Sequence, residues 1–176
     1  EDLITRKVDL ILVNPTDSDA IVPSVEAANA AGIPVMTVDR TANGGEVVSH
    51  IASENVAGGV LAGEFIVEKI GEAGKVVELE GIPGANSTTE RGEGFAKAIE
   101  GTEIEVVARQ TANYDRTEGL NVMENLLQSN PEIDAVFAQN DEMALGALEA
   151  IQSSGREILV VGFDATDDAV ASVEEG

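Results

Sequence analysis

Residues 75–99 read KVVELEGIPGANSTTERGEGFAKAI, and this stretch decides the fold class. It opens with an apolar run, Lys75 to Leu79, passes through a turn rich in glycine, and continues as a helical pattern from Ser87 to Ile99. The apolar run lacks clean alternation with polar residues, as expected for a strand whose sheet is covered by helices on both faces. A strand that leads into a helix predicts a right-handed crossover and therefore a parallel sheet.

The same rhythm extends in both directions along the chain. Further strands are predicted at residues 9–14, 33–38, 47–52, 104–108, 135–138 and 159–163. Further helices are predicted at residues 18–31, 55–70, 117–128, 142–153 and 166–175. Asn55 is the expected N-cap of the helix at 55–70. The alternation predicts an α/β protein with doubly wound parallel sheets.

Topology, rather than composition, divides the chain. Residues 1–53 supply only two strong strands, which is little for an independent core, whereas residues 54–176 supply four. The chain opens in what reads as the end of a helix and closes within or just after another. We therefore expect two lobes, of which the first is incomplete, in a chain that is a fragment of a longer protein.

Charge and composition exclude several classes of function. The 176 residues carry a net charge of −23, from 10 basic and 33 acidic residues, and such a field repels the phosphates of nucleic acids. The acidity suits either a protein of a saline habitat or an ordinary acidic protein. The chain has no cysteine and one histidine, so we expect no disulfide, no metal site and no Ser-His-Asp chemistry. No apolar run approaches the ~20 residues of a membrane-spanning helix, so we expect no membrane insertion.

Polar side chains follow nearly every predicted strand. In open α/β sheets, ligands bind outside the carboxyl ends of the strands, where these side chains would converge. Carboxylates that accept, arginine and amide groups that donate, and an aromatic ring together suit a neutral sugar, which offers hydroxyls and apolar ring faces. The candidate ligand-binding residues are Asp39, Arg40, Arg91, Tyr114, Asn140 and Asp164.

Each of these residues also has a plainer interpretation. Asp39 suits a turn, Asn140 or its neighbour suits a helix N-cap, and Asp164 suits the cap of the last helix. Arg91 suits a surface ion pair with a neighbouring glutamate, and Tyr114 suits a partly buried edge position. The prediction of a binding site therefore depends on their convergence on one edge, and not on any single residue.

Glycines and the single histidine have structural interpretations. The loop at residues 81–85 lies between a strand and a helix but lacks the spacing and the lysine of phosphate-binding loops, so a phosphate role is disfavoured. Gly58, Gly59 and Gly63 fall within a predicted helix and indicate close helix packing. His50 is expected to be a strand residue that bonds to its neighbours.

The chain resembles the ribose-binding branch of the periplasmic sugar-binding family, the solute-binding proteins of bacterial ABC transporters. The resemblance covers essentially the whole chain and is most specific from Ala138 to Leu148. The segments that carry it are Asn14–Ser18, Val38–Arg40, Val47–Ile51, Glu90–Phe95, Ala138–Ala144 and Val161–Asp164.

The resemblance implies two doubly wound domains, joined by hinge crossings, that close on a sugar. Residues 1–53 would be the later half of the N-terminal lobe, and residues 54–176 most of the C-terminal lobe. The family's ligands to the sugar hydroxyls would fall on Asp39, Arg40, Arg91, Asn140 and Asp164, with Tyr114 where the family has a ring-stacking Phe. The family also uses an opening segment and a glutamine near the last hinge, for which this chain has no counterpart.

The expected function is capture of a monosaccharide, ribose or a similar pentose, for delivery to an ABC permease, without a cofactor. The resemblance places such a protein in the periplasm or tethered to the outer face of the cytoplasmic membrane, and allows a chemoreceptor as a further partner. The alternative is the sugar-responsive effector domain of a lac-repressor-type transcription regulator, which shares the fold. An enzyme with Asp39 and Asp164 as acid and base is disfavoured, because neighbouring arginines would keep both carboxylates ionised.

Overall fold

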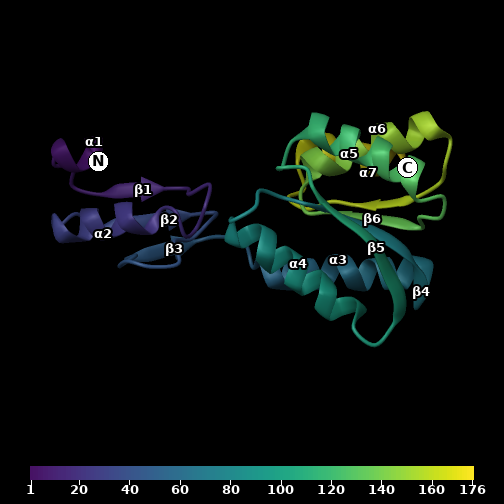
Figure 1. The fold of residues 1–176 in the computed structure, drawn as a ribbon, viewed down its shortest axis with the longest axis horizontal. Coiled ribbons are helices and arrows are strands. Elements are labelled where there is room, and N and C mark those ends of the chain that lie inside the picture. Colours follow the sequence, from purple (N-terminus) through teal and green to yellow (C-terminus); the bar gives the residue numbers. More distant parts are fainter.

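The computed structural model describes residues 1–176, which form two units arranged along the long axis of the molecule (Figure 1). The three-stranded unit contains α1 (Asp2–Thr5), β1 (Ile11–Val13), α2 (Val22–Ala30), β2 (Val35–Val38) and β3 (Ser49–Ile51). The four-stranded unit contains α3 (Asn55–Ile70), β4 (Ala73–Glu80), α4 (Asn86–Ile99), β5 (Glu103–Thr111), α5 (Arg116–Ser129), β6 (Ala135–Ala138), α6 (Asp141–Ser154), β7 (Leu159–Val161) and α7 (Asp167–Glu175).

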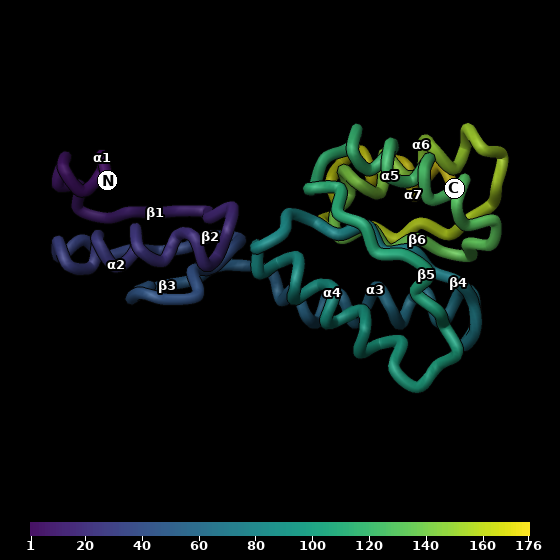
Figure 2. The backbone as a smooth tube through the Cα atoms, viewed as in Figure 1, coloured from purple at the N-terminus to yellow at the C-terminus, as the bar shows by residue number.

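Both sheets are entirely parallel. Their strand orders are β1-β2-β3 and β5-β4-β6-β7, so consecutive strands within each sheet are joined by crossover connections. The predicted α/β class with parallel sheets is confirmed. Between β3 and α3, residues 52–54 carry the chain from one unit to the other (Figure 2).

Helices cover both faces of the four-stranded sheet, with α3 and α4 on one side and α5 and α6 on the other (Figure 1). On the first side, Phe95 of α4 packs against Val76 and Phe137, and the two rings lie 5.0 Å apart between centroids. On the other side, Val77 and Leu79 join a larger cluster with α5 and α6. Because β4 and β6 are buried on both faces, their sequences do not alternate, as predicted.

Glycines allow α3 and α4 to pack closely. A Cβ atom on Gly59 would overlap the carbonyl oxygen of Arg91, and one on Gly63 would overlap Ala98. The predicted role of these two glycines in helix packing is confirmed. Gly58 instead faces the ring of Phe163, in the loop after β7. The close approach fixes the backbone of α4, and with it the position of Arg91, against α3.

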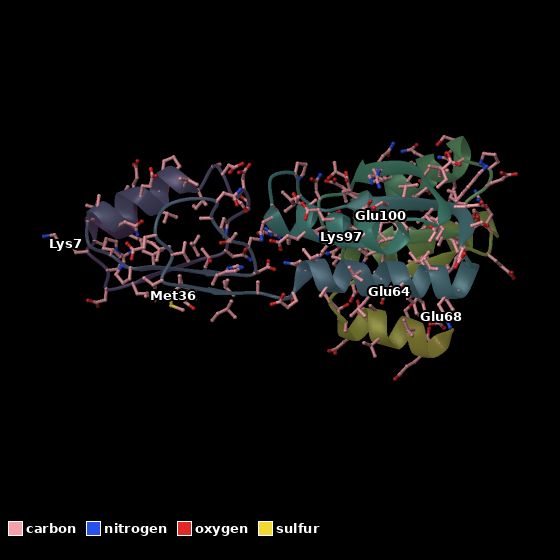
Figure 3. All side chains as sticks on the ribbon, turned by 90° about the horizontal axis from the view of Figure 1, so that it is seen from below. Lys7, Met36, Glu64, Glu68, Lys97 and Glu100 are labelled. Carbon is pink, nitrogen blue, oxygen red and sulfur yellow. The ribbon has the colours of Figure 1, made fainter.

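The three-stranded sheet is covered on one face. Val25 and Ala28 of α2 pack on Val35, whereas Leu12 and Ile51 on the opposite face are 61% and 60% exposed. Figure 3 shows Lys7 at the far end of this unit and Glu64 on α3 of the other. His50 Nδ1 lies 2.8 Å from Thr37 Oγ1 on the neighbouring strand, which confirms the prediction for this histidine.

Several element boundaries differ from prediction by a few residues, and two of these differences have a clear physical reason. The helix predicted at residues 18–31 begins only at Val22, because Asp17 accepts the backbone N–H groups of Asp19 and Ala20 and holds the preceding residues in turns. Pro23 lies in the first turn of α2, where its missing N–H has no partner to lose. β5 is longer than the predicted 104–108, since it pairs with β4 along most of its length.

No helix is both long and apolar enough to cross a membrane.

Candidate functional site

A polar cavity of about 150 Å³ lies between the two units. Its lining contains every predicted ligand-binding residue: Asp39, Arg40, Arg91, Tyr114, Asn140 and Asp164, together with Ser87. The first two come from the three-stranded unit and the others from the four-stranded unit. The convergence expected from the carboxyl ends of parallel strands is therefore present in the structure.

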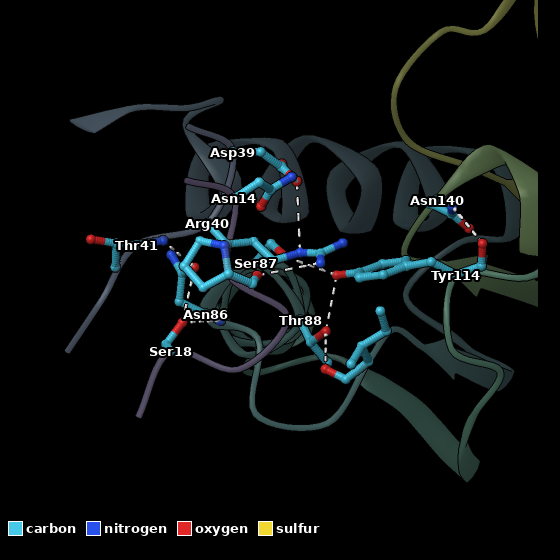
Figure 4. A network of polar contacts seen from close by, with 12 residues as sticks. Asn14, Ser18, Asp39, Arg40, Thr41, Asn86, Ser87, Thr88, Tyr114 and Asn140 are labelled. Atoms are coloured by element: carbon cyan, nitrogen blue, oxygen red, sulfur yellow. Dashed lines mark hydrogen bonds and ion pairs between the residues drawn. The ribbon is translucent and has the colours of Figure 1, made fainter. Parts of the chain in front are cut away.

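Asp39 and Arg40 follow β2 directly. Asp39 has a φ of 63°, so the chain turns there in the left-handed region, as the turn interpretation expected. Its Oδ2 accepts a hydrogen bond from Asn14 Nδ2 at 3.0 Å (Figure 4) and lies 3.6 Å from Arg40 Nε. That Arg40 Nε is buried and has no hydrogen-bond partner in the protein. An unpaired buried donor costs about 1–3 kcal/mol.

Tyr114 is held by its hydroxyl and by its ring. Its Oη lies 2.9 Å from Thr88 Oγ1 and 3.1 Å from Ser87 Oγ (Figure 4). Thr88 donates its own proton to the Ile82 carbonyl at 2.8 Å, so it accepts from Tyr114, and Ser87 then donates to Tyr114. The guanidinium of Arg40 lies 5.3 Å from the ring centroid. These contacts fix the ring as one wall of the cavity.

Arg91 is only 5% exposed, so the plainer interpretation of a surface ion pair with a neighbouring glutamate is wrong. Its Nε donates to Asn55 Oδ1 at 3.0 Å, its Nη1 donates to the Gln139 carbonyl, and its Nη2 lies 3.5 Å from Asp164 Oδ1. The guanidinium also lies 3.8 Å from the ring centroid of Phe163. Close packing of α3 and α4 buries this turn of α4, which sequence neighbours alone do not reveal.

Asn55 is not the N-cap of α3, so the prediction for this residue is wrong. Glu54 occupies that position without a side-chain bond, and Asn55 is 3% exposed. Its amide group instead bridges Arg91 and Glu90. The side chain of Asn55 therefore bonds to residues of α4 and not to the backbone N–H groups at the start of its own helix.

For Asn140 and Asp164, the sequence allowed both a helix-capping role and a place in the binding site, and the structure gives a different answer for each. Asn140 is the N-cap of α6, since its Oδ1 accepts from Met143 N at 2.9 Å, and it lines the cavity as well. Asp164 does not cap α7; that position belongs to Thr166. Asp164 has a φ of 109° and pairs with Arg91.

Burial raises the pKa of the Asp164 carboxyl above its ordinary value. Arg91 opposes the shift, and the negative charges of Asp141 and Asp39 add to it. Arg91 thus favours the ionised form of Asp164, as expected, but burial and the neighbouring negative charges outweigh it in setting the direction of the shift. The site concentrates acidic groups in a partly dehydrated space, and one arginine does not compensate for this.

The raised pKa of Asp164 predicts a pH-dependent contribution to stability. Below 3.8, its ordinary value, the carboxyl is protonated in the folded and unfolded chains alike. As the pH rises, the unfolded chain loses this proton first, so folding becomes less favourable until the raised pKa is passed. We expect the free energy of unfolding of Asp164→Asn, minus that of the parent, to increase across this window. Urea unfolding at a series of pH values measures the difference, and a flat difference contradicts the prediction.

Several residues of the site were not predicted. Ser87 lies in the first turn of α4 with 2% exposure, and its place in the segment after β4 was the available signal. Gln139 is fully buried beneath the cavity, where it accepts from Gly81 N at 3.0 Å and donates to Glu78 at 2.9 Å. Such support emerges only when β4 and β6 are neighbours in the sheet. No group of His, Asp or Glu side chains is arranged to hold a metal ion.

Two parallel α/β units with a small polar cavity between them are the architecture of bilobal α/β proteins. The chain belongs to the family described as periplasmic binding protein domain, whose pattern matches residues 1–176. Among curated proteins, it is 58% identical to ribose import binding protein RbsB of Bacillus subtilis over 175 residues, which cover 99% of this chain and 57% of the relative. It is 54% identical to the RbsB of Escherichia coli, over 100% of this chain and 60% of the relative. The chain thus spans less than two thirds of the length of these relatives.

Solved structures of sugar-binding and polyol-binding proteins have the same fold. A solute-binding protein of Bacillus halodurans with bound myo-inositol superposes with a TM-score of 0.94 at 39% identity, over 99% of this chain and 62% of that one. The periplasmic fold class expected from the sequence is therefore confirmed.

Proposed function

We propose that the full-length protein captures a monosaccharide, ribose or a similar pentose, between two hinged lobes and delivers it to an ABC permease. The observation that carries the proposal is the single cavity lined by Asp39, Arg40, Arg91, Tyr114, Asn140 and Asp164. The names of the curated relatives at 58% and 54% identity support ribose as the first ligand to test, and favour transport over the lac-repressor-type alternative.

The size and chemistry of the cavity suit a monosaccharide. Its volume of about 150 Å³ corresponds to about five water molecules at ~30 Å³ each, well below the ~300 Å³ at which pockets for drug-sized ligands begin. Asp39 and Asp164 accept from sugar hydroxyls, Arg40, Arg91 and Asn140 donate to sugar oxygens, and the ring of Tyr114 offers an apolar face.

The mechanism follows from the division of the site between the two units. A sugar that bonds to Asp39 and Arg40 on one side and to Arg91, Asn140 and Asp164 on the other makes its full set of contacts only when the lobes are together. Its binding therefore favours the closed state over the open state. On this proposal residues 1–53 are the later half of the N-terminal lobe and residues 54–176 are most of the C-terminal lobe.

On this proposal the protein is a binding protein and not an enzyme. The cavity contains no nucleophile paired with a base, and the single histidine, His50, bonds to Thr37 outside the cavity. No cofactor is required, and a net charge of −23 disfavours nucleic acid as a partner of this segment. The proposed location is the periplasm, or the outer face of the cytoplasmic membrane through a tether. The permease is the principal partner, and a chemoreceptor is a further one to test.

Titration calorimetry tests the proposal. We expect the full-length protein to release heat with D-ribose, and other pentoses and hexoses to bind more weakly because the small cavity is shaped by fixed donors and acceptors. Residues 1–176 alone should bind more weakly than the full-length protein. An absence of heat with every sugar would contradict the proposed function.

A further inference from the structure

The two units also bond to each other outside the cavity. Ser18 N donates to the Gly84 carbonyl at 2.9 Å, Asn86 N donates to Ser18 Oγ at 3.2 Å, and Thr41 N donates to Asn86 Oδ1 at 3.0 Å. Figure 4 shows Ser18 and Thr41 meeting Asn86 beside the cavity. Ser18 is fully buried, and none of these residues lines the cavity. These bonds can form only while the units are together.

Asn86 also begins a hydrogen-bonded chain that ends at Arg91. Its Nδ2 donates to Glu90 Oε1 at 3.0 Å, and Asn55 Nδ2 donates to Glu90 Oε2 at 3.0 Å. Arg91 Nε then donates to Asn55 Oδ1 at 3.0 Å. Each amide oxygen accepts and each amide nitrogen donates, so the chain runs without a mismatch from the Thr41 backbone to the Arg91 guanidinium.

The end of this hydrogen-bonded chain nearest Arg91 is buried, so each bond there matters energetically. Asn55 and Arg91 are 3% and 5% exposed, so the loss of one partner leaves a buried polar group unpaired. Linked hydrogen bonds also polarise one another, and the contribution of such a network exceeds that of isolated pairs. The first bond of the chain, from Thr41 N, crosses between the units. The orientation of Arg91 and the closure of the units are therefore physically connected.

We propose that Asn86 is a latch and positioning residue: it holds the two units closed through Thr41 and Ser18, and through Glu90 and Asn55 it orients Arg91 toward the ligand. The inference rests on the proposed sugar-binding function and names residues that do not contact the sugar. Because the latch bonds form only in the closed state, they shift the equilibrium toward closure and so raise the apparent affinity.

The test is Asn86→Ala in the full-length protein. We expect about 5- to 20-fold weaker binding of D-ribose by calorimetry, since bonds across the units are lost from the closed state only. The change should fall mainly on the dissociation rate. Ser18→Ala removes one latch acceptor and should have a smaller effect in the same direction. Asn125→Ala, on an exposed face of α5, is the matched control and should bind as the parent does.

A second measurement follows closure itself, which a purely structural defect would not shift. The chain has no cysteine, so Asp9→Cys and Glu124→Cys, both exposed and in different units, can carry a pair of fluorescent dyes. At a fixed, subsaturating D-ribose concentration, energy transfer should be lower for Asn86→Ala than for the parent. If Asn86→Ala and Ser18→Ala both keep the parent's affinity and energy transfer, the latch is disproved.

The two proposals fail in different ways. If the parent binds no sugar, the proposed function fails, and the energy transfer of the unliganded parent and Asn86→Ala still decides the latch. If the parent binds D-ribose and the variants bind it equally well, the function stands and the latch fails.

Discussion

Replacing Arg91 with alanine should weaken D-ribose binding by the full-length protein by about 100-fold or more. The side chain is 5% exposed and is surrounded by Asn55, the Gln139 carbonyl, Asp164 and the ring of Phe163. Its removal leaves these acceptors without their donor and removes a charge-assisted bond to the ligand. Removing a buried charge-assisted hydrogen bond across a binding interface costs about 2–5 kcal/mol, and each ~1.4 kcal/mol is tenfold in affinity.

Titration calorimetry with D-ribose measures this loss of affinity. Two further variants show whether the loss is specific to Arg91 and to its guanidinium group. Arg116→Ala removes an arginine of α5 that pairs with Glu142 and Asp168 outside the cavity, so affinity should be unchanged. Arg91→Lys retains the charge but not the planar set of donors, and should recover only part of the affinity. Circular dichroism confirms that each variant is folded. Parent-like affinity in a folded Arg91→Ala would remove Arg91 from the binding site.

Replacing Phe95 with alanine should lower the free energy of unfolding by about 3–5 kcal/mol. Phe95 is fully buried between α3 and the sheet, in contact with Phe137. Removal of the ring loses buried apolar area and leaves a cavity that the strands cannot fill, because they are packed on both faces. Urea unfolding followed by circular dichroism gives the difference.

Phe65→Ala is the matched control for the core. Phe65 lies on α3 but is 42% exposed, so the same truncation should cost less than about 1 kcal/mol. Comparable losses for the two variants would mean that Phe95 does not anchor the core between α3, α4 and the sheet.

Local sequence patterns were sufficient for much of the fold because they reflect local causes. Asn140, for example, caps the helix that follows it, as one interpretation of this residue expected. Where a local preference competed with a distant partner, prediction failed. Asn55 has the residue type of an N-cap, yet it bonds to Arg91 and Glu90, which lie on another helix.

The sequence by itself determined the α/β class and every residue that lines the cavity except Ser87. Parallel strands all deliver their carboxyl ends to one edge, so a polar residue that follows a strand is placed near the others without further information. Only the tertiary structure decided how these residues are used. The burial of Arg91 depends on the glycine-mediated approach of α3 and α4, and the raised pKa of Asp164 depends on the sum of burial and neighbouring charges from both units. The contacts from Thr41 to Asn86 likewise depend on the meeting of the two units. Such effects arise between residues far apart in the chain, and no spacing or composition encodes them.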